Sequence, residues 1–226
     1  MGQRERGLID GMQQDHVTVA AGEGVVSQGE RSRSLYSVCY GWALRYQTLR
    51  DGSRQILDVL LPGDPVALAS VVLGASMHSV QALTPACFCT LNGRKVVALF
   101  QVNAKLALAV LRSRLEEECR TDVRLTMLGR MSAEERVGYF LIETFERLRQ
   151  RGMTNGTTCR FPLRRVDIAD AVGLSRVHLM RALRELRSQA LVELNGGDMI
   201  VPRAARLAAY TGYTKVVTSI GSDVRV

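Results

Sequence analysis

The most informative segment of this chain is VDIADAVGLSRVHLMRALRELR, which spans Val166–Arg187. Its apolar residues recur at three- and four-residue steps, and this spacing predicts two short amphipathic helices. Gly173 ends the first helix, and Ser175 is placed to cap the second by accepting a hydrogen bond from a backbone amide. The segment therefore predicts a pair of helices joined by a tight turn.

The second helix of this pair carries a row of basic side chains, which are Arg176, His178, Arg181, Arg184 and Arg187. A short helix with several guanidinium groups, held at a fixed angle by the helix before it, fits the major groove of DNA. The alternative is an ordinary helical hairpin whose basic face is solvated.

The positive charge of the chain is concentrated around the same segment. The 226 residues carry a net charge of +8, and residues 151–226 hold 12 Lys and Arg against 6 Asp and Glu. Residues 1–150 are nearly balanced, with 18 basic against 16 acidic side chains. A basic excess beside the helix pair is what a phosphate-binding surface requires.

The sequence gives no sign of a membrane or exported protein. It has no long apolar run, and its N-terminus lacks the apolar core of a signal peptide. We therefore expect a cytoplasmic protein without a membrane partner, whose five cysteines are reduced thiols.

The residues between Val17 and Leu91 are typical of β-structure, because short apolar runs alternate with Gly, Asp and Pro. Asp51-Gly52 is a strong hairpin signal. Many short strands with such turns predict a sandwich or a barrel. The candidate strands are Val17–Val19, Gly24–Val26, Leu35–Tyr40, Ala43–Leu49, Ile56–Leu60, Ser79–Leu83 and Phe88–Leu91.

A long helix without proline is predicted from Ala104 to Met131. Its apolar residues recur at three- and four-residue steps and form a plausible seam for a partner helix. The alternative is a helix packed on its own β-domain, because Glu118 and Asp122 interrupt a clean heptad. The seam consists of Leu108, Leu111, Leu115, Cys119 and Val123. Ser132–Glu135 is then a capping box that begins a new helix.

A short strand is predicted before the helix pair, over Cys159–Leu163, and a hairpin after it. The hairpin strands are Leu191–Leu194 and Met199–Val201, and the Asn195-Gly196 step supplies the positive φ angles of the turn. A helix pair followed by such a hairpin is a winged helix-turn-helix. This arrangement strengthens the interpretation that the chain binds DNA.

The segment Gly22–Asp64 resembles the β-roll of the cyclic-nucleotide-binding fold. Its matching pieces are the GEGVVSQGE start, the LYSVCYG strand, the Asp-Gly hairpin and the closing LPGD. Together with the winged helix-turn-helix, they make the chain similar to the Crp/Fnr family of bacterial transcription regulators. The resemblance covers about Gly22 to Gly212, and the motifs occur in the order of the family.

This resemblance implies an α+β fold in three parts. They are an N-terminal β-roll sensor domain of the double-stranded β-helix type (1–103), a long dimerisation helix (104–131) and a C-terminal winged helix-turn-helix DNA-binding domain (132–226). It also implies a homodimer that pairs along the long helix and reads a palindromic operator in double-stranded DNA. RNA polymerase would be a further partner if the chain is an activator.

The resemblance places the base-reading positions of the family on Arg176, Val177 and Arg181. The planar fork of arginine can bond O6 and N7 of guanine together. The family commonly has an acidic residue where Val177 stands, and valine cannot accept a proton from cytosine N4. This departure puts the familiar operator sequence in doubt.

A second set of side chains is expected around the DNA backbone, where contacts give register rather than sequence. Arg164, Arg165 and Ser175 belong to this set. His178 is expected to contact either phosphate or base, although an exposed histidine on a helix is often incidental.

The effector site of the family is degenerate in this chain. Cyclic-AMP binders of the family use a Gly-Glu pair, which stands here as Ala67-Leu68. Their downstream Arg-Ser pair falls near Met77, His78 and Ser79. No arginine stands between Asp64 and Gly93. Leucine cannot bond a ribose hydroxyl, and nothing there matches the charge of a phosphate. We expect that cyclic AMP does not bind, and that the small-molecule effector is unidentified or absent.

Three other sensing chemistries can be considered, and we expect no cofactor and no metal. An iron–sulfur cluster of the Fnr type would need clustered N-terminal cysteines, and residues 1–38 contain none. Cys87 and Cys89 share one face of a predicted strand and could form a redox pair with Cys39, but buried free cysteines are common. Haem ligation by His78, Met77 or a cysteine rests on a single histidine in a loop.

Catalysis is the function that the sequence supports least. The three histidines, His16, His78 and His178, lie in no Ser/His/Asp, metal-spaced or phosphate-loop motif. We therefore expect a DNA-binding transcription regulator and not an enzyme. The alternative is a ligand-binding module whose basic C-terminal domain contacts protein or RNA, and selectivity among DNA duplexes distinguishes the two.

Overall fold

A computed structural model gives the fold and describes residues 13–31 and 34–214. The chain divides by its internal contacts into two compact units. Unit 1 comprises Met1–Ala109 and Pro162–Ala171, and unit 2 comprises Val110–Phe161 and Val172–Val226.

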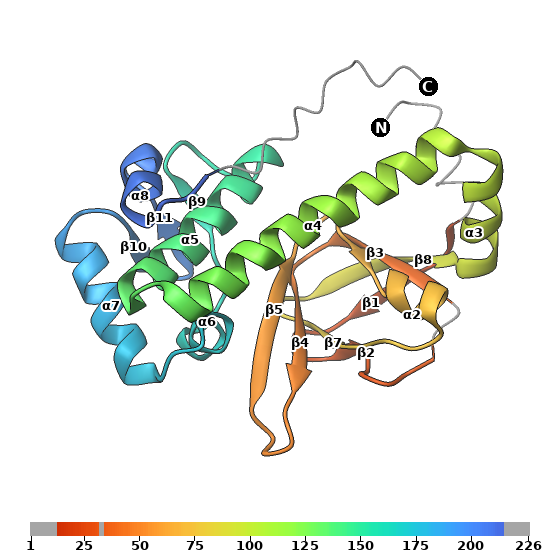
Figure 1. Ribbon diagram of the computed structural model, residues 1–226, viewed down its shortest axis with the longest axis horizontal. Coiled ribbons are helices and arrows are strands. Elements are labelled where there is room, and N and C mark those ends of the chain that lie inside the picture. The colour runs from red at the N-terminus through yellow and green to blue at the C-terminus, as the bar shows by residue number, and fades with distance from the viewer. Residues whose placement is uncertain (1–12, 32–33, 215–226) are drawn as a thin grey trace. The chain divides into compact units, whose positions relative to one another are not determined.

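Unit 1 is built on two four-stranded antiparallel sheets (Figure 1). One sheet has the order β1-β8-β3-β6 and the other the order β2-β7-β4-β5. Consecutive strands cross between the sheets, except β4 and β5, which pair with each other as the hairpin predicted at Asp51-Gly52. This is the predicted β-roll, and the predicted strands fall within one or two residues of most observed ones. The strands are β1 (Gln13–Val19), β2 (Gly24–Val26), β3 (Ser34–Tyr40), β4 (Ala43–Thr48), β5 (Arg54–Leu60), β6 (Pro65–Val66), β7 (Ser79–Ala82) and β8 (Ala86–Asn92).

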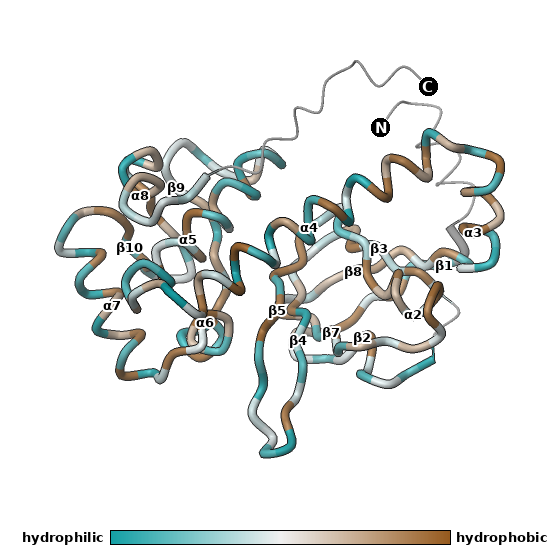
Figure 2. Tube along the Cα trace, in the orientation of Figure 1, coloured by the Kyte–Doolittle hydropathy of each residue, from teal (hydrophilic) through white to brown (hydrophobic). Residues whose placement is uncertain are grey.

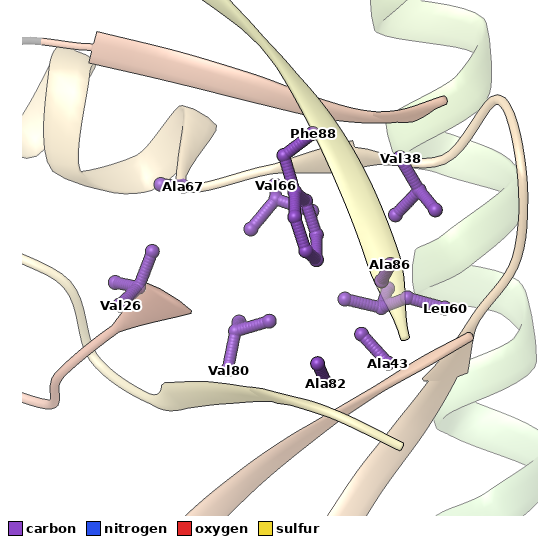
Figure 3. Packing of buried hydrophobic residues seen from close by; sticks show 10 residues of the cluster. All are labelled: Val26, Val38, Ala43, Leu60, Val66, Ala67, Val80, Ala82, Ala86 and Phe88. Carbon is purple, nitrogen blue, oxygen red and sulfur yellow. The ribbon is translucent and has the colours of Figure 1, made fainter. Parts of the chain in front are cut away.

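The two sheets bury an aliphatic core between them. Figure 3 shows side chains from both sheets pointing toward one another, with the Phe88 ring among them. The alternation of a strand explains the pattern, since Ala86 and Phe88 of β8 face inward while the residues between and beyond them face the other side of the sheet. The cluster comprises Val26, Val38, Ala43, Leu60, Val66, Ala67, Val80, Ala82, Ala86 and Phe88.

Two short helices of unit 1, α2 (Leu68–Leu73) and α3 (Gly93–Val102), are not predicted by the sequence. α2 has only six residues and no side-chain cap, which leaves little local pattern to detect. α3 does carry a signal, because the Asn92 side chain accepts a hydrogen bond from the Lys95 backbone N–H.

The long helix α4 (Ala104–Arg130) confirms the predicted helix and ends at a break before α5 (Ala133–Gln150). The predicted capping box begins α5: Glu135 N–H donates to the Ser132 hydroxyl at 3.2 Å, and Ser132 N–H donates to the Glu135 carboxylate at 2.8 Å. No single described helix is both long and apolar enough to cross a membrane. The pair α3 and α4 passes that test only together, and it is bent by 115°.

The core of unit 2 lies where α5 packs against α7 (Arg176–Ser188) and α8 (Ala204–Thr211). Every residue of α5 from Val137 to Leu148 is buried. The Tyr139 ring packs edge-on against Tyr213, with centroids 5.4 Å apart. The helix before α7, α6 (Arg165–Val172), belongs to unit 1 up to Ala171.

The wing of unit 2 is a three-stranded antiparallel sheet of order β10-β11-β9. Its strands are β9 (Thr158–Arg160), β10 (Glu193–Asn195) and β11 (Asp198–Ile200). The two turn residues are Gly196 and Gly197, with φ angles of 57° and 85°. The sequence predicts positive φ angles at Asn195 and Gly196, but the structure has them at Gly196 and Gly197. Asn195 is therefore the last residue of β10 and not part of the turn.

Candidate nucleic-acid interface

The start of α7 is fixed by local contacts. Gly173 adopts a φ of 63°, in the left-handed region that favours glycine, and turns the chain after α6. The Ser175 hydroxyl accepts a hydrogen bond from the His178 backbone N–H and lies 2.7 Å from the His178 Nδ1 atom. Ser175 and His178, two of the predicted auxiliary residues, are exposed at the start of α7 and contact each other.

α7 has one buried and one exposed face. Leu179, Ala182 and Leu186 are fully buried in unit 2. The predicted base-reading residues occupy the opposite face, where Val177 is 67% exposed and Arg176 and Arg181 are exposed as well. The apolar spacing of the helix thus forces its basic positions outward.

The arginines of this exposed face are free to bind a ligand. Within residues 13–31 and 34–214, the guanidinium groups of Arg176, Arg181 and Arg184 form no hydrogen bond or ion pair. Arg187, one turn further on, differs because its guanidinium lies 2.9 Å from the Glu193 carboxylate on β10. The face therefore offers three guanidinium groups whose donors are not already used.

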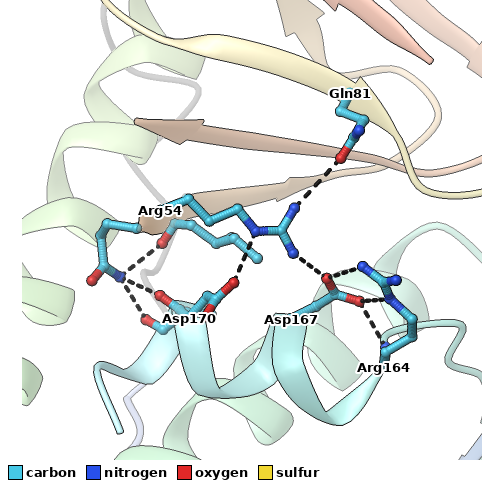
Figure 4. Close-up of polar contacts among 8 residues, drawn as sticks. Arg54, Gln81, Arg164, Asp167 and Asp170 are labelled. Atoms are coloured by element: carbon cyan, nitrogen blue, oxygen red, sulfur yellow. Dashed lines mark hydrogen bonds and ion pairs between the residues drawn. The ribbon is translucent and has the colours of Figure 1, made fainter. Parts of the chain in front are cut away.

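Arg164 has an acidic partner, unlike Arg176, Arg181 and Arg184 (Figure 4). Its Nε atom lies 3.0 Å from Oδ2 of Asp167, and its backbone N–H donates to the same oxygen at 2.9 Å. Asp167 also accepts a hydrogen bond from Arg54 of unit 1, whose Nε lies 2.8 Å from Oδ2 of Asp170. A DNA phosphate would compete with Asp167 for Arg164. Arg165 is half-buried, and burial lowers its pKa.

Asp167 is fully buried at the centre of this cluster. Burial alone would raise the pKa of its carboxyl group, but the hydrogen bonds and charge of Arg164 and the hydrogen bond of Arg54 outweigh that effect. The pKa of Asp167 therefore lies below the usual range of an aspartate. The carboxylate stays charged and joins α6 to β5 within unit 1.

The residues of the degenerate effector site lie in unit 1 among apolar or engaged groups. Ala67 is part of the aliphatic core, and its φ of 63° is one that a glycine would adopt freely. Leu68 packs on a smaller cluster that contains Leu35. Met77 is exposed, His78 is half-buried, and Ser79 Oγ accepts a hydrogen bond from a backbone N–H at 3.0 Å.

The predicted seam of α4 is an exposed apolar stripe. Leu108 and Leu111 are each 52% exposed and Leu115 is 48% exposed. Cys119 is exposed and Val123 is half-buried further along the helix. Figure 2 shows the corresponding alternation of brown and teal along α4. Exposing such a stripe to water is unfavourable, so it is suited to burial against a partner.

The predicted thiols come together on the sheet formed by β1, β8 and β3. Cys39 and Cys89 are joined by a disulfide, with Cα atoms 6.0 Å apart, so the expectation of reduced thiols is wrong for this pair. The Nδ1 atom of His16 lies 3.8 Å from the Cys87 sulfur and 3.6 Å from the Cys89 sulfur. The sequence does not reveal this role of His16, which is 71 residues away from Cys87 and reaches it only through the pairing of β1 with β8.

Two family models match the chain. The model described as cyclic nucleotide-binding domain matches residues 16–103, and the model described as Crp-like helix-turn-helix domain matches residues 135–210. The second match contains α7 and the wing.

The chain is also similar to named proteins over most of its length. It is 30% identical to the transcriptional activatory protein AadR of Rhodopseudomonas palustris, over 85% of this chain and 77% of AadR. It is 29% identical to the nitrogen fixation regulation protein FixK of Rhizobium meliloti, over 84% of each chain. The solved structure of FixK2 from Bradyrhizobium japonicum has the same fold, with a TM-score of 0.79, 23% identity, and coverage of 88% of this chain and 98% of FixK2.

Proposed function

Since the chain belongs to the Crp/Fnr family of DNA-binding transcription regulators, we propose that it acts as a homodimer on a palindromic operator. The observation that carries this proposal is the exposed face of α7, where three guanidinium groups have no partner among the described residues. A two-fold dimer presents two such faces to successive turns of the major groove, and this arrangement selects a palindrome.

Base reading is assigned to Arg176, Val177 and Arg181. The two arginines supply bidentate donors suited to guanine, and Val177 offers an apolar surface suited to a thymine methyl group. Backbone or auxiliary contacts are assigned to four residues at the starts of α6 and α7, of which Arg164 must exchange its bond with Asp167 for a phosphate. The four are Arg164, Arg165, Ser175 and His178.

Dimerisation is assigned to the exposed stripe of α4. Burying three half-exposed leucines from each protomer removes apolar surface from water, at about 25 cal/mol per Å². The ion pair between Arg112 and Glu116, at 3.2 Å, lies on the same helix. The Leu108–Val123 seam is therefore the proposed contact between two copies of the chain.

We further propose that the β-roll does not bind cyclic AMP, and that the regulator works without an effector or with a different one. Ala67 and Leu68 are packed with apolar neighbours, so the positions of the Gly-Glu pair supply no group for a ribose hydroxyl. A regulator that acts on chromosomal DNA belongs in the cytoplasm. If the chain activates transcription, as the name of AadR says of that protein, RNA polymerase is its partner.

Selection of duplexes from a random pool tests the proposed function. Purified, reduced protein without added ligand is expected to enrich a consensus of two inverted half-sites, with centres about 10 base pairs apart or a multiple of this. Binding that is sensitive to salt but enriches no consensus would contradict sequence-specific recognition by the free protein. Enrichment of a single, unrepeated half-site would contradict the dimer.

A further inference from the structure

One face of the first sheet of unit 1 gathers four side chains that bind soft metal ions, here called the thiol cluster. The central strand β8 pairs with β1 on one side and with β3 on the other. Since Phe88 of β8 points into the aliphatic core, Cys87 and Cys89 project from the opposite face of the sheet. The cluster comprises His16, Cys39, Cys87 and Cys89.

The flanking strands β1 and β3 each place one side chain beside Cys87 and Cys89. His16 of β1 stands directly opposite Cys89 in the antiparallel register. In β3 the register with β8 shifts between Val38 and Tyr40, so Cys39 lies at a β-bulge. Bulges commonly re-aim a side chain, and the sulfur of Cys39 reaches that of Cys89.

The donor atoms of three of these side chains lie close enough together to share one ion, once Cys39 and Cys89 are reduced. The ligand atoms of His16, Cys39 and Cys89 all lie within 4.8 Å of one another. The imidazole nitrogen is 3.6 Å from the Cys89 sulfur and 3.8 Å from the Cys87 sulfur. A tetrahedral Zn²⁺ ion, at about 2.3 Å from sulfur and about 2.0 Å from nitrogen, holds neighbouring ligand atoms about 3.5–3.8 Å apart.

We propose that the thiol cluster is a tetrahedral binding site for a borderline-soft divalent cation of the Zn²⁺ class. Three thiolates and one imidazole form a donor set that such ions prefer over Mg²⁺ or Ca²⁺. Cys39 and His16 are exposed, which gives an ion a path to the buried Cys89. The bound ion would join β1 to β3 across β8, and this role does not depend on DNA binding.

The metal site requires the reduced protein, because the structure joins Cys39 to Cys89, with Cα atoms 6.0 Å apart, and this disulfide is the competing chemistry. It would use only two of the four donors. It leaves out the His16 imidazole and the Cys87 thiol, which the pairing of β1 with β8 places 3.8 Å apart. The metal site accounts for all four side chains.

Titration of the full-length, reduced protein with Co²⁺ tests the site, because tetrahedral thiolate coordination gives intense charge-transfer and visible absorption. One Co²⁺ per chain is expected to bind with these bands, and Zn²⁺ is expected to displace it. Cys87→Ser and His16→Ala are each expected to weaken the affinity at least about tenfold and to change the spectrum. Circular dichroism confirms that the variants fold.

Cys119→Ser provides the matched control, since Cys119 is an exposed free thiol on α4, outside the cluster. It is expected to leave both the affinity and the spectrum unchanged. The proposal is overturned if the reduced wild-type protein shows no thiolate-to-metal bands, or if these bands persist unaltered in Cys87→Ser and His16→Ala. A protein isolated with a Cys39–Cys89 disulfide that binds no Co²⁺ after reduction would also overturn it.

Discussion

The arginines of this chain differ in what their guanidinium groups already bind. Arg164 is held by the buried Asp167 and Arg187 by Glu193, whereas Arg176 and Arg181 have no partner within the described residues 13–31 and 34–214. A guanidinium group without an internal partner can bond a base edge without first breaking an ion pair. Partner availability, rather than the number of arginines, separates base-reading candidates from structural ones.

The buried Asp167 makes stability depend on pH in the acid range. Its pKa is lowered in the folded protein, so its contribution is present above the unfolded carboxyl pKa of about 3.9 and is lost as pH falls through the folded value. We expect the gap in free energy of unfolding between the wild type and Asp167→Asn to narrow as pH falls below about 4.

Chemical denaturation from pH 7 to pH 3 measures this gap. Asp198→Asn is the control, because Asp198 pairs with Arg160 at 3.1 Å in an exposed contact. A gap for Asp167→Asn that stays constant over the whole range would show that this carboxylate does not have a lowered pKa.

Substituting Gly41 and Gly52 by alanine distinguishes the cost of backbone strain from the cost of steric crowding. Their φ angles are 84° and 83°, so alanine is strained equally at both positions, by about 1–2 kcal/mol. A Cβ atom on Gly41 would lie 2.5 Å from the Pro85 carbonyl oxygen, whereas one on Gly52 would meet nothing within 4 Å.

We expect Gly52→Ala to lower the free energy of unfolding by about 1 kcal/mol and Gly41→Ala by about 3 kcal/mol or more. Urea denaturation of the two variants measures the difference. Equal losses would mean that the chain around Pro85 moves aside without cost, against the close approach that the fold shows.

At the scale of elements, α4 presents an exposed apolar stripe that a dimer contact would bury. Replacing two half-exposed leucines of its seam by asparagine, as Leu111→Asn with Leu115→Asn, removes apolar burial from both protomers of the proposed dimer. We expect the dimer dissociation constant to rise by at least about a hundredfold. Sedimentation velocity measures the oligomeric state.

Leu73→Asn is the matched control, since Leu73 is 75% exposed on α2 and lies outside the seam. It is expected to leave the dimer intact. A double seam variant that still forms dimers at wild-type concentrations would place the dimer contact elsewhere.

Elements with strong local signals are predictable from this sequence. Alternating apolar residues give most strands of the β-roll, and Ser132 and Ser175 mark the helix starts that the structure has at α5 and α7. Elements without such signals are not predicted: the two-residue strand β6 and the six-residue helix α2 are too short for a periodic pattern.

The candidate site follows the same division. The exposed face of α7 can be predicted, because its helical period alone separates buried from exposed residues. The bond from Arg54 to Asp167 spans 113 residues, and the contact of His16 with Cys89 spans 73 residues. No local pattern encodes such pairs, and they emerge only when strands and helices are placed in space.

At the scale of the whole molecule, the proposed function depends on two copies of the exposed α7 face, one from each protomer of the dimer. A single α7 contacts only a few base pairs, and the specificity of a regulator needs two half-sites read together. In the proposed dimer, the seam of α4 joins the two protomers and the free arginines of each α7 read one half-site. A change in one arginine must appear at two symmetry-related positions of the operator.

The most direct test is to select duplexes from one random pool with the wild type, Arg181→Ala and Arg187→Ala in parallel. We expect Arg181→Ala to lose about 1–3 kcal/mol of binding free energy and to relax one base position in each half-site. Arg187→Ala, whose arginine is bound to Glu193, is expected to keep the wild-type consensus. A consensus that Arg181→Ala leaves unchanged, with an equal loss of affinity on all duplexes, would contradict base reading by α7.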